Sequence, residues 1–280
     1  MKNNNYKILY ICTIDTFVKA FLLQEIYKLI KSGHKVEIAC SQNNKDKVLA
    51  ETGLKIHNIS LIRSKNLKLI IRVIKEYYSL IKINKYDVIH THNHVSGVLA
   101  RLVARLAGVR YIIHTAHGFY FHDDMPFIKY WFYHSIERFT SYFTDLIFSE
   151  SKEDLLTAIK THLAPKEKLK YLSGGIDLNK FNGKKMNNKI TDDICNEINI
   201  SIDAFPIIGY SGRMTSEKGL NELISAFENV LEFFPKSKLI FIALKAEGER
   251  DDFQSEIKKK IYKPLLKNKI FITYKKDVPS

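Results

Sequence analysis

The stretch KILYICTIDTFVKAFLLQEIYKLIKSGHKVEIAC, residues 7–40, decides the fold. Residues 7–12 and 35–40 are short apolar runs rich in β-branched side chains, a pattern typical of buried strands. Between them, apolar residues recur at helical spacing over residues 17–30, and Gly33 stands where a helix would end. Because consecutive strands joined by a helix pair in parallel, this stretch predicts a parallel sheet covered by helices.

The same alternation continues along the first part of the chain. Further strands are predicted at residues 87–91, 111–115 and 145–149, weaker ones at 55–60 and 169–172, and a second long helix at 67–83. Together these elements predict that residues 1–172 form a complete seven-stranded Rossmann-like domain.

A second cycle follows a polar, apolar-poor segment at residues 183–199. It consists of predicted strands at 207–211, 238–243 and 269–273 and predicted helices at 217–233 and 250–262. A doubly wound sheet usually has five or six strands, so this cycle predicts a partial, truncated domain. The expected organisation is α/β throughout, with an N-terminal domain at 1–182, a linker at 183–205 and a partial C-terminal domain at 206–280.

Composition narrows the class of protein. The chain has 280 residues, of which 45% are hydrophobic, and no run approaches the ~20 apolar residues of a membrane-spanning helix. Residues 1–12 lack the pattern of a secretory signal, which predicts a cytoplasmic chain. The three cysteines, Cys12, Cys40 and Cys195, show no CxxC spacing and therefore indicate neither a disulfide framework nor a thiolate metal site.

Positive charge is concentrated in one segment of a chain whose net charge is +14. Residues 55–85 contain one acidic residue, Glu76, and eight basic ones. The basic residues are Lys55, Arg63, Lys65, Lys68, Arg72, Lys75, Lys82 and Lys85. Such a cluster is typical of a surface that binds an anionic membrane or another polyanion, and also of an ordinary solvated face. Because no recognised nucleic-acid module accompanies it, no nucleic-acid partner is predicted.

Two loops after strands bear on phosphate binding. The first turn, Thr13–Phe17, contains no glycine, which argues against a nicotinamide or flavin fingerprint, and no P-loop motif occurs. The loop after 207–211 is a better anion site. Arg213 follows Gly212, and Ser216 is expected to cap a helix with Lys218 in its first turn, so that two cations lie beside a helix N-terminus. The alternative is that both cations are ordinary surface charges.

Six of the ten histidines lie between residues 90 and 122. His90, His92 and His94 would share one face if their segment stays extended, and a zinc site is a weak alternative because no cysteine lies nearby. A second group, His114, His117 and His122, follows another predicted strand. Since parallel strands end at the same edge of a sheet, both groups predict a ligand cleft there, without a metal.

Residues 126–143 form a predicted helix crowded with aromatic side chains and holding Trp131, the single tryptophan. Burial between domains is expected for this helix. The alternative is a face that rests against lipid headgroups.

Four motifs in this order resemble the family 4 glycosyltransferases, in particular the branch that builds capsular, exopolysaccharide and lipid-linked glycans. They are VIHTH at 88–92, HTAHGF at 114–119, GGIDLNKF at 174–181 and GYSGRMTSEKG at 209–219. The resemblance covers nearly the whole chain. It implies a GT-B fold of two Rossmann-like domains, a nucleotide-sugar donor held by the second domain, an acceptor held by the first, and retention of configuration without a metal or other cofactor.

Carried over by position, the resemblance assigns roles to single residues. Arg213 and Lys218, with Gly212, would neutralise the donor diphosphate, and His117 would be the catalytic-site residue that hydrogen-bonds the donor sugar. His92, Thr13 and Asp15 would line the cleft, which Arg213 would share.

The sequence departs from the family at two places. The Gly-Gly pair of the first turn is replaced by Thr13-Ile14-Asp15-Thr16, and no two glutamates stand in the E-x7-E spacing that contacts the donor, a segment expected beyond Ser280. The leading interpretation is transfer of a sugar from a UDP-linked donor to a lipid-linked or polysaccharide acceptor, at the inner face of the cytoplasmic membrane. Alternatives are a nucleotide-sugar epimerase of GT-B fold, a truncated non-catalytic remnant and a nucleic-acid-binding protein.

Overall fold

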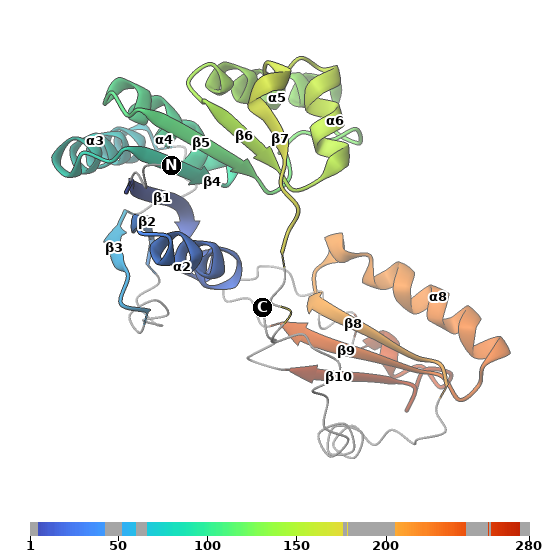
Figure 1. The fold of residues 1–280 in the computed structure, drawn as a ribbon. Helices are drawn as coiled ribbons and strands as arrows, with labels where there is room; N and C mark the ends of the chain where they lie inside the picture. The colour runs from blue at the N-terminus through green and yellow to red at the C-terminus, as the bar shows by residue number, and fades with distance from the viewer. Residues whose placement is uncertain are drawn as a thin grey trace. The chain divides into compact units, whose positions relative to one another are not determined.

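The computed structural model describes residues 5–42, 52–59, 66–175, 178, 205–244, 257 and 259–274. The chain separates into two compact units, Met1–Gly175 and Ile176–Ser280, shown in Figure 1 and described here one at a time. The expected domain boundaries at residues 182 and 205 stay a prediction, because residues 179–204 lie outside the described residues.

Unit 1 is built on one parallel sheet of seven strands in the order β3-β2-β1-β4-β5-β6-β7. The strands are β1 (Lys7–Ile14), β2 (Lys35–Ser41), β3 (Lys55–Asn58), β4 (Val88–His92), β5 (Tyr111–Ala116), β6 (Leu146–Ser149) and β7 (Leu169–Tyr171). This order confirms the predicted seven-stranded Rossmann-like sheet. The chain first builds outward from β1 to β3 and then returns to β4, so the order reverses between β1 and β4, where open α/β sheets bind their ligands.

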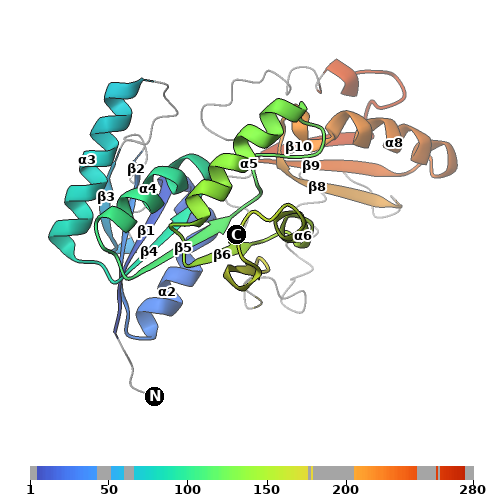
Figure 2. The same ribbon diagram turned by 90° about the horizontal axis from the view of Figure 1, so that it is seen from above.

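Helices cover both faces of this sheet. They are α1 (Asp15–Phe17), η1 (Val18–Leu22), α2 (Leu23–Lys31), α3 (Leu67–Asn84), α4 (His94–Leu106), α5 (Phe127–Ser141), α6 (Lys152–Lys160) and η3 (Lys166–Lys168). Helices α3, α4 and α5 pack in a row on one face, and α2 lies on the other, as Figures 1 and 2 show. The helix predicted at 17–30 is interrupted, because residues 18–22 form a π-helical turn.

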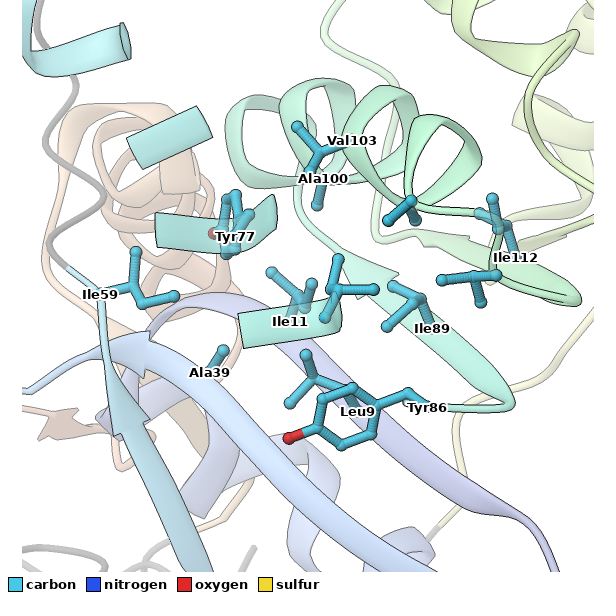
Figure 3. Close-up of a cluster of buried hydrophobic side chains, with 14 of the residues drawn as sticks. Leu9, Ile11, Ala39, Ile59, Tyr77, Tyr86, Ile89, Ala100, Val103 and Ile112 are labelled. Carbon is cyan, nitrogen blue, oxygen red and sulfur yellow. The ribbon is translucent and has the colours of Figure 1, made fainter. Parts of the chain in front are cut away.

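The largest apolar core of unit 1 lies between the sheet and helices α3 and α4 (Figure 3). Helix α3 contributes Val73, Tyr77 and Ile81, which recur every four residues and so share one helix face. Strands β1 and β4 contribute Leu9, Ile11 and Ile89, all fully buried. A second cluster around Tyr10, Ile26 and Ile38 packs α2 against the opposite face. Because one apolar core lies on each face of the sheet, the strands of unit 1 carry apolar side chains on both sides.

Unit 2 contains a separate parallel sheet in the order β10-β9-β8 among its described residues. Its elements are β8 (Ile207–Arg213), η5 (Ser216–Lys218), α8 (Leu220–Phe233), β9 (Lys238–Leu244) and β10 (Ile270–Tyr274). Because β8 pairs with β9 and with no strand of the first sheet among the described residues, the predicted separate second sheet is confirmed. That this second domain is partial stays a prediction. Of the helix expected at 250–262, only residue 257 and residues 259–262 lie within the described part, and Tyr262 is a turn residue.

Helix α8 starts later than the sequence predicted. Residues 216–218 form a 3-10 turn, Gly219 adopts a left-handed conformation with φ of 66°, and the α-helix begins at Leu220. The side chain of Ser216 is therefore not the cap of this helix, and Lys218 lies in the turn before it. The positive φ of Gly219 separates the 3-10 turn from the α-helix, and glycine adopts this φ without strain.

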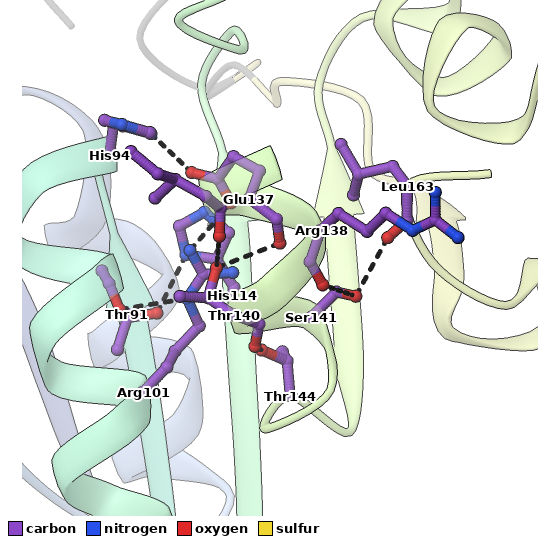
Figure 4. Close-up of polar contacts among 12 residues, drawn as sticks. Thr91, His94, Arg101, His114, Glu137, Arg138, Thr140, Ser141, Thr144 and Leu163 are labelled. Carbon is purple, nitrogen blue, oxygen red and sulfur yellow. Dashed lines mark hydrogen bonds and ion pairs between the residues drawn. The ribbon is translucent and has the colours of Figure 1, made fainter. Parts of the chain in front are cut away.

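Helix α5 carries large apolar side chains on its exposed side: Phe127, Ile128 and Phe132 are 76%, 82% and 60% exposed. The expected burial of this helix between domains stays a prediction, because the two units are described separately. The buried residues of α5 are polar, among them His134 and Glu137. A hydrogen-bonded network beneath the helix explains why the polar side faces inward (Figure 4).

Candidate functional site

The candidate site of unit 1 lies at the carboxyl edge of β1, β4, β5 and β6. Backbone pairing aligns His92 on β4 with Thr115 on β5, and Ala116 on β5 with Ser149 on β6. The residues that follow these strands, including His117 and Glu150, therefore come out at one edge. This is the edge at which the order of the strands reverses, so the histidines lie where the fold favours a ligand.

The first turn of the chain is tied to the start of α4. The Thr13 amide and hydroxyl both donate to Asn93 Oδ1, at 3.3 and 3.2 Å. Asn93 has a φ of 64° and a ψ of 151°, a conformation that is strained for residues other than glycine. Asp15 is buried, and its Oδ1 accepts from the Thr16 amide at 2.8 Å. These bonds fix the shape of the turn, which contains no glycine. Thr13 is half-buried, and the Asp15 side chain bonds to a backbone amide within the same turn.

A chain of hydrogen bonds links His92, His117 and Glu150. His92 Nδ1 lies 3.0 Å from His117 Nε2, and His117 Nδ1 lies 2.9 Å from Glu150 Oε2. A carboxylate accepts but does not donate, so His117 carries a hydrogen on Nδ1. When His117 is neutral, its Nε2 accepts from His92 Nδ1–H, and His92 Nε2 is then left as a buried acceptor without a partner among the described residues.

Burial decreases from one end of this chain of hydrogen bonds to the other. The side chain of His92 is fully buried, that of His117 is 16% exposed and that of Glu150 is 39% exposed. Burial, reinforced by the neighbouring histidine rings, lowers the pKa of His92 well below its usual value. The buried neutral ring supports His117, which is the more accessible of the two.

His90 occupies a structural position behind this pair. Its Nε2 lies 2.8 Å from Thr115 Oγ1, and its ring centroid is 4.2 Å from that of His92. Burial, with a smaller effect from His117, lowers the pKa of His90 to about 3. His90 therefore stays neutral at physiological pH and belongs to the core of the sheet edge.

The structure overturns the expectation that His94 shares a face with His90 and His92. Strand β4 ends at His92, and His94 is the first residue of α4. His94 Nδ1 lies 2.5 Å from Glu137 Oε1 on α5, and Arg101 Nη2 donates to Glu137 Oε2 at 2.8 Å (Figure 4). His94 thus joins two helices. His114 also contacts this region through Thr91 Oγ1 at 2.9 Å, and His122 is exposed in the loop before α5.

The candidate anion site of unit 2 lies in the loop between β8 and α8. Arg213 and Lys218 are both exposed, and the Tyr210 hydroxyl donates to the Arg213 carbonyl at 2.9 Å. A Cβ at Gly212 would lie 2.7 Å from that hydroxyl, so glycine is needed for this arrangement. Thr215 Oγ1 is buried without a hydrogen-bond partner among the described residues. The loop offers two cations and the amides before α8 to an anion.

The structure brings some predicted site residues together and describes others separately. His92 and His117 are in contact, with Thr13 and Asp15 in the first turn of the same unit, whereas Gly212, Arg213 and Lys218 belong to unit 2. A cleft shared by His92, His117 and Arg213 stays a prediction. Sequence reasoning missed Glu150 and Asn93, although both stand directly after strands, which was the available signal.

Two features are absent from the described residues. No three His, Cys, Asp or Glu side chains in this part of the chain converge on a possible metal site. No helix within the same residues has the length and apolar character needed to cross a membrane.

Comparison with known proteins gives the family. A family model described as glycosyl transferase 4-like matches residues 7–151. The chain is 37% identical over 124 residues to an Escherichia coli protein named UDP-Gal:alpha-D-GlcNAc-diphosphoundecaprenol alpha-1,3-galactosyltransferase, an alignment covering 44% of this chain and 30% of that protein. It is 28% identical over 239 residues to EpsD of Bacillus subtilis (strain 168), provisionally named a glycosyltransferase, covering 84% of this chain and 60% of EpsD. Each alignment spans less than two thirds of the relative.

Solved structures support the fold. A glycosyltransferase from Rickettsia africae ESF-5 superimposes with a TM-score of 0.76 at 19% identity, over 98% of this chain and 69% of that one. The UDP-GlcNAc 2-epimerase from Neisseria meningitidis, solved with UDP-GlcNAc bound, gives 0.63 at 13% identity, over 97% and 73%. At such identities the structural similarity shows a common fold. It does not distinguish a glycosyltransferase from an epimerase.

Proposed function

Because the chain belongs to the glycosyl transferase 4-like family, we propose that it transfers a sugar from a UDP-linked donor to a lipid-linked acceptor, with retention of configuration and without a metal. The observation that carries this proposal is the 37% identity to the Escherichia coli galactosyltransferase, whose name specifies both a UDP-sugar and a diphosphoundecaprenol-linked acceptor. That alignment covers part of each protein, so donor and acceptor are proposed here by chemical class.

The loop of unit 2 is suited to the diphosphate of the donor. Arg213 and Lys218 are exposed cations that stand before α8, whose N-terminal amides have no partners within the helix. Negative charge develops on the diphosphate as the bond to the sugar breaks, and fixed cations stabilise that charge. We therefore assign the leaving nucleoside diphosphate to this loop.

His117 is assigned to a hydroxyl group of the donor sugar. Its Nδ1–H points to Glu150, and a hydroxyl can accept from that hydrogen while donating to the carboxylate. The buried His92 behind it fixes the ring from the other side. A hydroxyl placed between Nδ1 and the Glu150 carboxylate would thus replace one hydrogen bond by two.

Thermal unfolding with and without UDP tests the assignment of the donor. A ligand at 100 times its dissociation constant stabilises the folded protein by about 2.7 kcal/mol, so UDP is expected to raise the melting temperature of the full chain. The Arg213→Ala and Lys218→Ala variants should lose most of this shift, and Lys267→Ala, an exposed cation of the same unit, should keep it. Equal shifts in all four proteins would contradict the proposal.

Transfer itself is tested with UDP-galactose and a synthetic polyprenyl diphosphate carrying N-acetylglucosamine. Label moving from the donor to the lipid supports transfer. An epimerase would instead change UDP-GlcNAc in the absence of any acceptor, which separates the second enzymatic interpretation from the first.

A lipid-linked acceptor requires the protein to bind at a membrane surface. We assign the contact with anionic lipid to the basic segment at residues 55–85. Lys55, Lys68, Arg72, Lys75, Lys82 and Lys85 are all exposed. Arg63 and Lys65 lie outside the described residues. Near anionic lipid each such cation contributes about 1 kcal/mol, and salt at 1 M shortens the Debye length to about 3 Å.

Sedimentation with vesicles tests this contact. The full chain should bind anionic vesicles at low salt and lose most binding when Lys68, Arg72 and Lys75 of α3 are changed to Glu. A matched triple change of Lys19, Lys28 and Lys31, exposed on η1 and α2 at the other face of the sheet, should have a smaller effect. Similar losses in both variants would indicate a general effect of net charge and reject this surface.

A further inference from the structure

Helix α5 buries a largely polar side, although its Tyr130 and Tyr133 also pack against the apolar cluster around Phe121. Its inner side carries His134, Glu137, Thr140 and Ser141, all buried. Its outer side carries the four residues that we call the α5 apolar face: Phe127, Ile128, Trp131 and Phe132, exposed by 76%, 82%, 40% and 60%. A helix on a water-soluble surface normally shows the opposite arrangement, with its apolar stripe toward the core.

Specific bonds fix this orientation. Glu137 pairs with Arg101, which is fully buried, and His134 Nε2 lies 2.9 Å from Thr161 Oγ1. Ser141 Oγ donates to the Leu163 carbonyl at 3.0 Å. Turning the apolar side inward would break these bonds and leave the Arg101 charge buried without its partner, which is strongly unfavourable. The outward apolar side is therefore a built feature of the fold.

The face continues into a shallow hollow of about 420 Å³. It is lined by Tyr120, Met125, Ile128, Lys129, Phe132 and Tyr133. Aromatic rings with polar tips, a tryptophan and a lysine beside large apolar side chains are the composition of surfaces that rest in the interfacial layer of a bilayer.

The neighbouring helix row indicates what covers this face. Helices α3, α4 and α5 lie on the same side of the sheet (Figures 1 and 2), with α3 packed on α4 and α4 on α5. The exposed surface of α3 carries Lys68, Arg72 and Lys75, together with the exposed apolar side chains of Leu67 and Ile71. A partner that covers this side must accept cations over α3 and apolar side chains over α5.

We propose that the α5 apolar face inserts into the interfacial layer of an anionic lipid bilayer, while the cations of α3 hold the anionic headgroups beside it. The inference deepens the proposed function, because it rests on a lipid-linked acceptor at a membrane. It adds a second, apolar contact that salt does not screen, so that docking has an electrostatic step and an insertion step.

Trp131 makes the insertion directly measurable, because it is the single tryptophan of the chain and lies on the face itself. The full chain is mixed with vesicles of phosphatidylglycerol and phosphatidylcholine. We expect the emission of Trp131 to shift to shorter wavelength and lipids brominated near the headgroup end of the acyl chain to quench it. Once formed at low salt, this signal should largely persist after salt is added.

Paired variants separate insertion from charge attraction. Ile128→Ser with Phe132→Ser should weaken vesicle partitioning roughly ten-fold, because two apolar side chains no longer leave water. Leu156→Ser on α6, a side chain that is 55% exposed outside the α3–α5 row, is the matched control and should bind like the unchanged protein. All three positions are exposed, so the variants should fold, which circular dichroism checks.

Three outcomes overturn the inference, the third being an absent lipid signal. The first is vesicle binding without any change in Trp131 emission or quenching, which would mean that α3 alone docks. The second is a partitioning loss in Leu156→Ser as large as in the double variant. Protection of the full chain by UDP is measured in parallel without vesicles. Loss of the lipid signal with UDP protection intact rejects the inference alone, whereas loss of UDP protection rejects the proposed function.

Discussion

Arg101 on α4 donates from Nη2 to Glu137 Oε2 on α5 at 2.8 Å, and both side chains are buried. Burial by itself raises the pKa of the Glu137 carboxyl, but the charge of Arg101 and the hydrogen bond from His94 outweigh it, so the pKa lies below its usual value. The pair links the two helices beneath the α5 apolar face, and it sets which side of α5 is turned outward.

Removing one partner of this pair should be strongly destabilising. We expect Glu137→Ala to lower the free energy of unfolding by about 3–5 kcal/mol, because it leaves the Arg101 guanidinium buried and unpaired. Glu137→Gln should cost less, since the amide oxygen can still accept a hydrogen bond. Urea denaturation followed by circular dichroism measures both. Glu153→Gln, an exposed acid in the first turn of α6, is the control and should change stability by less than about 1 kcal/mol. A Glu137→Ala effect no larger than the control would show that the pair is not stabilising.

Buried histidines should make the protein less stable in mild acid. Burial lowers the pKa of His90 to about 3 from 6.5, and burial also lowers the pKa values of His92 and His114. The unfolded chain takes up these protons near pH 6.5, whereas folded His90 resists them until about pH 3. Stability from His90 is therefore fully present above pH 6.5 and is lost as the pH falls toward 3, by about 1.4 kcal/mol per pH unit.

The free energy of unfolding at pH 7.5 and 5.5 gives this slope. His90→Gln should flatten it, because glutamine can retain the contact with Thr115 without taking up a proton. His122→Gln, at an exposed position, should leave it unchanged. An identical slope in His90→Gln would show that His90 does not contribute to the pH dependence.

The sheet of unit 1 was predictable because its strands are buried on both faces. Runs such as residues 7–12 and 35–40 then appear as continuous apolar segments, and Gly33 marks the return from helix to strand. The start of α8 was not predictable from the same signals. Ser216 and Glu217 look like a helix start, but the left-handed conformation of Gly219 delays the α-helix to Leu220.

The candidate site was predictable in location and less so in detail. Histidines after parallel strands must come out at one edge, which places His92 and His117 together. The separation of His94 from them depends on where β4 ends, a matter of one or two residues that periodicity does not fix. The inward polar side of α5 was not predictable, because it requires the tertiary pairing of Glu137 with Arg101 from another helix.

Two glycines of β8 offer a matched test of the loop that carries Arg213. A Cβ at Gly212 would lie 2.7 Å from the Tyr210 hydroxyl, whereas a Cβ at Gly209 meets nothing within 4 Å. We expect Gly212→Ala to displace Tyr210 from the Arg213 carbonyl and to weaken UDP binding several-fold. Gly209→Ala should preserve binding and be neutral or stabilising by up to about 1 kcal/mol. Calorimetric titration with UDP compares them, and equal affinities would mean that the Tyr210 contact does not shape the loop.

His117 should distinguish the sugar of the donor from its nucleotide. If its Nδ1–H binds a sugar hydroxyl, His117→Ala removes one hydrogen bond to UDP-galactose and none to UDP, so the affinity for the sugar nucleotide should fall roughly ten-fold while that for UDP stays the same. Glu150→Gln should fall between the unchanged protein and His117→Ala, because the amide oxygen can still accept from Nδ1–H although the charge is lost. His122→Ala, a histidine of the same loop with an exposed side chain, should match the unchanged protein for both ligands. Titrating all four proteins with UDP and UDP-galactose under one buffer condition checks the expectation. A loss in His117→Ala that is equal for UDP and UDP-galactose would place its effect on the nucleotide or on folding, and would remove His117 from the sugar site.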